Sequence, residues 1–308
     1  MMMRRLSVAA LCWFSMFAAA DPAPAPDPAC RPYHVVDVAY DGPHRFDSGL
    51  LWKVSRSGAP DSYLFGTIHV ADESITTLPD PVSEAFARAD SFIMEVLPDP
   101  DQIVLLSSMM FFGDGRRLND MVPAGIFAGA AGILEAYHLP EQAVSAMKPW
   151  AAFLTMSYPP DMRTVLDIEL LHMAQERGMA VSGLETLEEQ GNVFDRMNLD
   201  DQITLLVDAT CHYKEALQDF EKMKSLYLAR DLRRLYEYGQ RYEFADNSVY
   251  ERLMRRLLTD RNRVMVQRMM PALERGGSFV AIGAMHLPGR DGVLSLLDSR
   301  HYRIEKLY

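Results

Sequence analysis

Ser278-Phe279-Val280-Ala281-Ile282-Gly283 is an unbroken apolar run that ends in glycine. A run this short, bounded by turn residues, predicts a strand that is buried on both faces. Two further runs of the same kind cover 91–97 and 179–184, and each of the three follows a segment with helical periodicity. These segments are 81–89, 166–177 and 247–274. Because strands and helices alternate, the sequence predicts an α/β domain with a central mixed sheet flanked by helices.

Two other sequence features extend this predicted fold. Residues 50–54 and 63–68 are β-favouring runs joined by the turn-rich segment Ser57-Gly58-Ala59-Pro60-Asp61, and this pattern predicts a hairpin. Residues 101–158 differ from the rest because they contain long apolar stretches of helical character. We interpret them as a helical insertion, or cap, on the sheet domain.

The amino-terminal residues indicate export. Three methionines and two arginines precede an apolar stretch that ends in three alanines, which is the pattern of a cleaved secretory signal over 1–20. The apolar stretch is too short for a membrane span, which takes about 20 residues, although an uncut signal would remain as a tether. Residues 21–30 are rich in proline and alanine and predict an extended leader. We therefore expect a periplasmic or secreted domain over 31–308.

The chain is acidic, with 42 aspartates and glutamates against 31 lysines and arginines. Removal of residues 1–20 takes away two arginines and no acid, so the formal net charge changes from −11 to −13. Such a surface repels phosphate backbones and anionic lipid headgroups. We expect no nucleic-acid partner and no stable membrane span after processing, and the sequence leaves the oligomeric state open.

Two cysteines, Cys30 and Cys211, remain after the signal. In an oxidising compartment an even pair is a candidate disulfide, which would tie the amino-terminal arm to the body of the domain. The alternative is two unrelated thiols.

Two histidines stand three residues after a glycine, in Gly66-Thr67-Ile68-His69 and Gly283-Ala284-Met285-His286. One such spacing is weak evidence in a chain with 18 glycines. Both tetrapeptides, however, close apolar strands, so each histidine is expected at the carboxyl end of a strand. Open α/β sheets bind their ligands at that edge.

Glu95 interrupts the apolar run 91–97, where a charged carboxylate is costly unless it has a partner. A metal ion is one such partner, and His69, Glu95 and His286 would form a three-ligand set that leaves a position open for water. The set suits zinc, manganese, iron or cobalt. The alternatives are that each histidine is an ordinary interior or turn residue and that Glu95 pairs with a buried arginine.

Glu185 and Arg261 are candidates for acid–base and electrostatic roles. Glu185 ends the run around 181–184 and could serve as general base or as a further ligand. Alternatively, it belongs to the acidic first turn of a helix. Arg261 could stabilise an oxyanion or bind an acidic substrate group, or it could be a solvated arginine on a helix face.

Several common enzyme signatures are absent from the sequence. It has no His-Glu-x-x-His zinc helix, no Gly-x-Ser-x-Gly elbow, no phosphate loop and no glycine pattern for dinucleotides. The interpretations as an ordinary metalloprotease, serine hydrolase or nucleotide enzyme therefore lose support.

In order and spacing, the motifs resemble the TraB/GumN family, which includes Tiki-like metalloproteases and shares a core with erythromycin-esterase-like proteins. The resemblance covers about 49–308. It rests on Gly66 to Asp72, Glu95, Lys148-Pro149-Trp150, Leu184-Glu185 with Glu189-Gln190, Arg261-Asn262, and Gly283 to Leu287 with Gly289 and Gly292.

This resemblance implies a metal centre of His69, Glu95 and His286 and the hydrolysis of peptide bonds by a metal-bound water. Glu95, Glu185 and Arg261 would then be the catalytic residues, and a peptide or other small molecule the substrate. Two alternatives remain: an extracytoplasmic protein that captures a peptide or haem-like ligand with the same histidines, and a structural domain whose histidines bind no metal.

Overall fold

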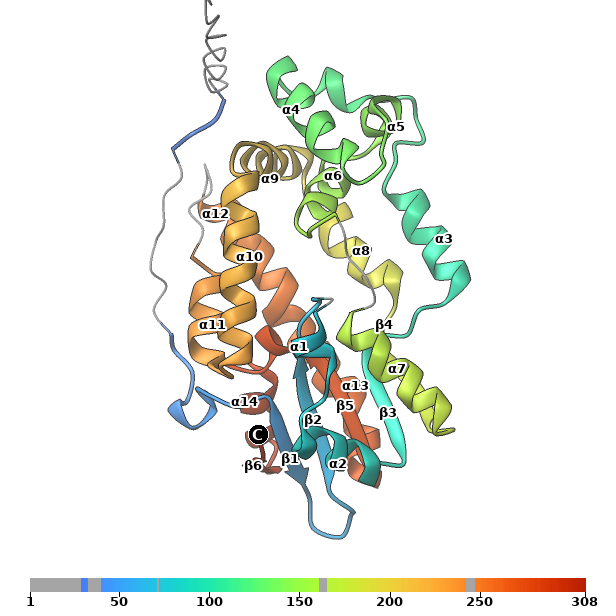
Figure 1. Ribbon diagram of the computed structural model, residues 1–308, viewed down its shortest axis with the longest axis vertical. Coiled ribbons are helices and arrows are strands. Elements are labelled where there is room, and N and C mark those ends of the chain that lie inside the picture. The colour runs from blue at the N-terminus through green and yellow to red at the C-terminus, as the bar shows by residue number, and fades with distance from the viewer. Residues whose placement is uncertain (1–28, 33–39, 71, 161–164, 242–246) are drawn as a thin grey trace, which may run out of the picture.

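The computed structural model describes residues 29–32, 40–70, 72–160, 165–241 and 247–308 (Figure 1). The predicted signal, 1–20, and residues 21–28 of the predicted leader lie outside these ranges. Within them, none of the helices combines the length and the apolar character that a membrane crossing requires.

A six-stranded mixed sheet forms the body of the molecule. Its strands are β1 (Leu51–Ser55), β2 (Ser62–Thr67), β3 (Ser91–Val96), β4 (Ala180–Glu185), β5 (Ser278–Gly283) and β6 (Arg303–Lys306). They lie in the order β4-β3-β5-β2-β1-β6. The four strands from β4 to β2 are parallel, β1 forms an antiparallel hairpin with β2, and β6 is antiparallel to β1. The predicted mixed sheet and hairpin are confirmed.

Helices, joined by loops and short turns, surround the sheet in the described residues. They are α1 (Glu73–Thr76), α2 (Asp80–Arg88), α3 (Pro100–Met109), α4 (Ala124–Glu135), α5 (Glu141–Ala146), α6 (Pro149–Met156), α7 (Leu166–Glu176), α8 (Leu187–Asp195), α9 (Leu199–Cys211), α10 (Tyr213–Leu228), α11 (Leu232–Gly239), α12 (Asn247–Met254), α13 (Arg261–Arg275) and α14 (Val293–Asp298). A π-helical turn, η3 (Arg255–Asp260), joins α12 to α13, and a 3-10 turn, η4 (Ala284–His286), follows β5. The three predicted helices are confirmed as α2, α7 and the α12–α13 segment.

The first of two hydrophobic cores packs around the sheet. An aromatic cluster in this core holds neighbouring strands in place. Phe86 of α2, Phe92 of β3 and Phe279 of β5 are buried, and their ring centroids lie 5.1 to 6.4 Å apart. Burial of each such side chain stabilises the fold by about 1.5–3 kcal/mol. The cluster fixes α2 on the sheet and β3 beside β5, so the carboxyl ends of these strands meet at one edge.

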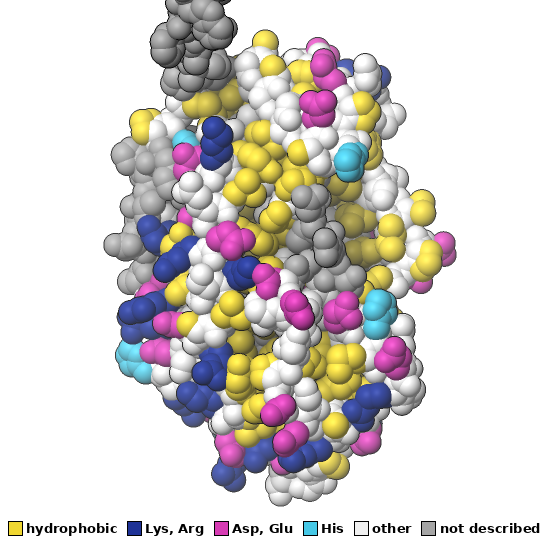
Figure 2. Space-filling view, viewed as in Figure 1, with side chains coloured by type: hydrophobic (Ala, Val, Ile, Leu, Met, Phe, Trp, Pro, Cys, Tyr) yellow, Lys and Arg dark blue, Asp and Glu magenta, His cyan; other side chains and the backbone are white. Residues whose placement is uncertain are grey.

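A second core lies at the other end of the molecule, among helices above the sheet in Figure 1. Its centre is Trp150 of α6, which stacks on Phe194 of α8 with centroids 5.9 Å apart. The Trp150 indole and the Lys148 ammonium both donate to Asp195 Oδ1, at 2.8 and 2.6 Å. Helices from 101–158 share this core with α9 and α12, and hydrophobic side chains gather on the surface of this half in Figure 2.

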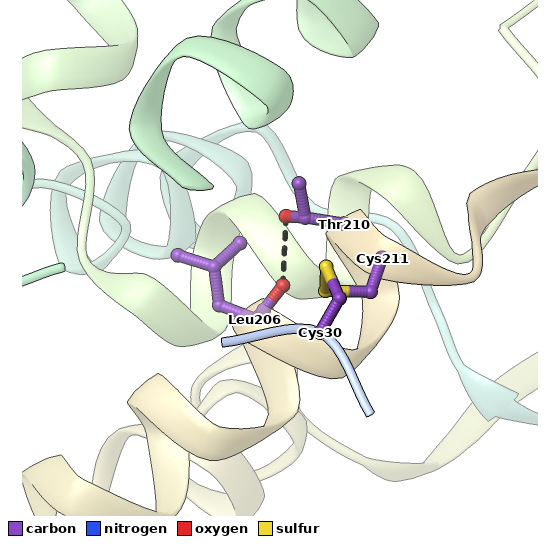
Figure 3. The surroundings of a disulfide bond; sticks show 4 residues. All are labelled: Cys30, Leu206, Thr210 and Cys211. Carbon is purple, nitrogen blue, oxygen red and sulfur yellow. Dashed lines mark hydrogen bonds between the residues drawn. A yellow bond between two sulfur atoms is a disulfide. The ribbon is translucent and has the colours of Figure 1, made fainter. Parts of the chain in front are cut away.

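The candidate disulfide is present. Cys30 is bonded to Cys211 at the end of α9, with a Cα–Cα distance of 5.5 Å (Figure 3). Ala29 and Cys30 also pack against the second core. The start of the described chain is therefore attached to the helical half of the molecule.

Candidate active site

The candidate residues come together at the carboxyl edge of the parallel strands. Glu95 lies within β3, Glu185 ends β4, and His286 ends the 3-10 turn after β5. His69 follows β2, and Arg261 begins α13 directly after the π-helical turn. Such single π turns occur frequently at functional sites.

The glycines of the two Gly-x-x-His motifs permit close packing. A Cβ on Gly66 would lie 2.7 Å from Leu287 Cδ1 and 3.2 Å from Ala284 Cα, in the turn of the other motif. A Cβ on Gly283 would lie 3.1 Å from Glu95 Oε1. The motifs thus need glycine because their backbones approach each other and Glu95, which the sequence spacing alone does not reveal.

His286 is held in one orientation by Asn262. The two side chains meet at 2.6 Å, from Nδ1 to Oδ1, and the Asn262 amide donates to the Asp291 carbonyl at 2.8 Å. Because Asn262 Oδ1 can only accept, Nδ1 of the imidazole carries the proton. Its Nε2 therefore presents a lone pair, and this atom faces Glu95 Oε1 at 3.6 Å.

His69 is oriented by Asp167, a residue of α7. Its Nδ1 lies 3.0 Å from Asp167 Oδ2, and the other carboxylate oxygen accepts from the Thr67 hydroxyl at 2.7 Å. The Asp167 side chain is 8% exposed and that of His69 is 43% exposed. The carboxylate thus directs Nε2 of His69 away from α7.

Arg261 connects the two glutamates. Its Nη2 donates to Glu95 Oε2 and to Glu185 Oε2, each at 2.7 Å, and its Nε donates to both oxygens of Glu185. Gln190 adds longer contacts of 3.3 and 3.4 Å to the same two carboxylates. The Arg261 side chain is 14% exposed. It is thus a buried ion-pair partner rather than a solvated helix-face arginine, and Glu95 does pair with a buried arginine.

Burial and charge set the protonation of these groups. Burial disfavours the charged form of Glu95, but the charges of His286, Arg261 and His69 and the Gly283 N–H, which donates to Oε1 at 2.6 Å, lower the pKa of Glu95 to about 2. Burial lowers the pKa of His286 to about 3, against the attraction of Glu95. At neutral pH the site therefore holds an ionised Glu95 beside a neutral His286.

The pKa of His69 shifts the other way. Partial desolvation of this half-exposed side chain disfavours the charged form, but the hydrogen bond and charge of Asp167, together with the charge of Glu95, raise the pKa of His69 to about 9. The two histidines therefore differ at neutral pH. His286 is a buried neutral imidazole, whereas His69 is protonated when no metal ion is bound to it.

Comparison with known proteins identifies the family. The model of the TraB/PrgY/gumN family matches residues 50–306, which is most of the chain. The chain belongs to this family. The resemblance predicted from the motifs is thereby confirmed.

Curated relatives of this TraB/PrgY/gumN protein are distant and longer. The chain is 24% identical over 315 residues to metalloprotease TIKI1 of Homo sapiens, an alignment that covers 84% of the chain and 62% of the relative. It is 25% identical to metalloprotease TIKI2 of Danio rerio, with 84% and 61% covered, and 24% identical to a TIKI homolog of Amphimedon queenslandica, with 84% and 62% covered. The chain thus spans about six tenths of the length of these relatives.

The donor chemistry of this family member fits a metal ion in part. In the part of the chain that the structure describes, no three histidine, cysteine or acidic side chains are gathered closely enough to hold one. However, Nε2 of His286 and Oε1 of Glu95 are two acceptors that face each other at 3.6 Å. Oε1 also accepts from the Gly283 N–H at 2.6 Å, and a proton or a cation between Oε1 and Nε2 would relieve the repulsion of the two acceptors. The imidazole Nδ1 atoms are fixed by Asn262 and Asp167, as second-shell partners fix metal-binding histidines.

Asp167 is not among the site residues that the sequence predicts. The buried positions of α7 include Asp167, Leu170, Leu171 and Ala174, which are spaced as one helix face. A carboxylate on an otherwise apolar face is the signal that could have identified it, because a buried charge requires a partner.

We expect Asp167→Asn to lower the pKa of His69 by about 1–3 in protein treated with a chelator, since one opposite charge nearby has an effect of this size. NMR titration of the imidazole resonances measures the change. Because the folded-state pKa of about 9 exceeds the ordinary 6.5, the Asp167–His69 pair stabilises the fold below pH 6.5, and this contribution is lost as the pH rises through about 9.

The matched control is Glu176→Gln, which removes a charge from the exposed end of the same helix. It should leave the titration of His69 unchanged. Identical pKa values of His69 in Asp167→Asn and the unsubstituted protein would contradict the assigned role of Asp167.

Proposed function

We propose that this chain is an extracytoplasmic metal-dependent hydrolase that acts on peptide bonds. One observation carries the proposal: Nε2 of His286 and Oε1 of Glu95 face each other at 3.6 Å, each with its other polar atom engaged elsewhere. This arrangement suits a shared cation. Membership of the TraB/PrgY/gumN family and the printed name of the relatives, metalloprotease, support peptide bonds as the target.

In this proposal, His286, His69 and Glu95 would hold a divalent ion, with Nε2 of the two imidazoles and Oε1 of the carboxylate as the donor atoms. Manganese, cobalt, zinc or iron are the candidates. When bound, such an ion acts as a Lewis acid that activates water and polarises a carbonyl. Asn262 and Asp167 keep both imidazoles in the tautomer that offers Nε2.

The charged residues beside the ligands have separate roles. Arg261 holds the carboxylates of Glu95 and Glu185 and places positive charge next to the reacting carbonyl, where negative charge develops. Glu185 transfers a proton to or from the substrate when one of its oxygens leaves Arg261. The predicted cap, 101–158, shapes the side of the site opposite the sheet.

Location outside the cytoplasm is supported by two features. The sequence pattern over 1–20 is that of an export signal. The Cys30–Cys211 disulfide belongs to an oxidising compartment, because cytosolic reductants keep thiols reduced.

The test begins with elemental analysis of the processed protein, beside His69→Ala, His286→Ala and the control His172→Ala. His172 is an exposed histidine of α7. We expect near-stoichiometric metal in the unsubstituted protein and in His172→Ala, and loss of metal in the other two variants. The absorption spectrum of Co²⁺ added to chelated protein gives a second measure of binding.

Turnover of a peptide library, analysed by mass spectrometry with each metal restored, completes the test. Cleavage that follows metal content supports the hydrolase. Stoichiometric metal without cleavage favours a protein that only captures its ligand, and no metal under any loading condition overturns the centre.

A further inference from the structure

Tyr158 brings a hydroxyl group from the helical half of the molecule to the candidate active site. It follows α6, and its carbonyl accepts a hydrogen bond from the Tyr137 hydroxyl at 2.5 Å. Tyr137 in turn meets the Tyr213 hydroxyl at 2.9 Å. Two tyrosines from other helical segments therefore fix the backbone at this position.

The phenol of Tyr158 lies among the site residues. Its ring centroid is 6.5 Å from that of His69. The charges of Glu95, Arg261 and Asp167 all act on the phenol.

The hydroxyl of Tyr158 is a hydrogen-bond donor that is available to a substrate. None of the residues that the structure describes accepts a hydrogen bond from it, whereas Arg261 already donates to Glu95, to Glu185 and to the Leu257 carbonyl. A phenol O–H that has no acceptor among the described residues, on a ring that lies beside the imidazole of His69, is suited to a substrate oxygen.

We propose that Tyr158 is a further catalytic residue whose O–H donates a hydrogen bond to the substrate carbonyl oxygen as that oxygen becomes negatively charged. The inference rests on the proposed hydrolase function and adds to it a residue from the cap. It also implies that the substrate is held between the sheet edge and the helical half of the molecule.

The role is defined by the electron movements of hydrolysis. When water adds to the carbonyl carbon, a C–O bond forms and the π electron pair moves to the carbonyl oxygen, where Tyr158 donates. When this electron pair on the oxygen forms the C=O π bond again, the C–N bond breaks. The amine then leaves with a proton that came from the water. Tyr158 ends the cycle as it began, because it donates a hydrogen bond and transfers no proton.

The test is Tyr158→Phe in the full processed protein, assayed on the peptide that the unsubstituted protein cleaves best. Removal of one oxyanion donor lowers kcat by about 10²–10³. We expect this loss with KM, Co²⁺ binding and the melting temperature unchanged. A residue that only packs against His69 would leave kcat unchanged as well, because phenylalanine keeps the ring that makes this contact.

The matched control is Tyr302→Phe. The Tyr302 hydroxyl is buried without a hydrogen-bond partner among the described residues, and the next residue, Arg303, pairs with Ser55 at the opposite edge of the sheet. The kcat of Tyr302→Phe should stay within about twofold of that of the unsubstituted protein, since no transition-state contact is lost. Equal kcat in Tyr158→Phe and the unsubstituted protein overturns the role of Tyr158 alone. A lack of cleavage by the unsubstituted protein overturns the hydrolase as well.

Discussion

Arg261→Met is expected to lower the free energy of unfolding by about 3–5 kcal/mol, because removal of one partner from a buried ion network leaves uncompensated charge. Here the loss leaves two carboxylates, Glu95 and Glu185, which are 9% and 5% exposed and share the one guanidinium. Methionine has a similar length, so loss of packing contributes little to the effect. Denaturant unfolding followed by circular dichroism measures the change.

Two further variants make this experiment specific. Arg88→Met removes an arginine that contacts Glu84 on the surface, where both side chains are about two-thirds exposed, and should cost no more than about 1 kcal/mol. Arg261→Met combined with Glu95→Gln and Glu185→Gln should recover most of the lost stability, because the buried charges are then gone. A cost below about 1 kcal/mol for Arg261→Met would mean that water reaches and solvates the two carboxylates.

Most of the sheet could be predicted because parallel strands buried on both faces are continuous apolar runs. β3 and β5 are buried strands of this kind, and the hairpin of β1 and β2 follows from its turn residues. The run at 179–184 also located β4, but the prediction that it is buried on both faces is wrong, because β4 is an edge strand in which only Leu184 and Glu185 are buried. β6 has no such signal: its sequence, Arg303-Ile304-Glu305-Lys306, is mostly charged because it forms an exposed edge of the sheet.

The helices between β4 and the last strands were harder to predict. No element is predicted from the sequence for α9, α10 or α11. The alternative that placed Glu185 in the acidic first turn of a helix is wrong for that residue, because Glu185 ends β4 and the acids in the first turn of α8 are Glu188 and Glu189, after the N-cap Thr186. Only Leu226 and Tyr227 of α10 are buried. A helix with so narrow a buried face has a weak periodic pattern, and tertiary packing decides its position.

Only some residues of the candidate site could likewise be predicted from the sequence. The motif histidines and Glu95 could be located because each breaks a local pattern at the end of, or within, an apolar strand. Their partners could not, because Asp167 and Tyr158 reach the site from helical segments about 90 to 100 positions away from His69 in the sequence. Periodicity likewise does not show that Arg261 points inward, since that depends on the π-helical turn before it.

The double variant Cys30→Ser with Cys211→Ser is expected to cost about 2–5 kcal/mol of stability. The bridge joins positions 181 residues apart, and a loop of that length gives a loss of chain entropy worth about 5 kcal/mol in the simplest treatment. Denaturant unfolding of both proteins, with and without a reductant, measures the effect. The reductant should destabilise only the protein that contains the disulfide.

The same variant separates the contribution of the disulfide from that of side-chain packing in the attachment of the amino-terminal arm. Serine is close to cysteine in size, so the packing of Ala29 and residue 30 against the second core changes little, and the expected loss arises mainly from the unfolded chain. A cost below about 1 kcal/mol would mean that the unfolded chain already keeps its ends close together. A cost near the upper limit would make stability depend on the compartment, because protein made under reducing conditions would behave like the double variant.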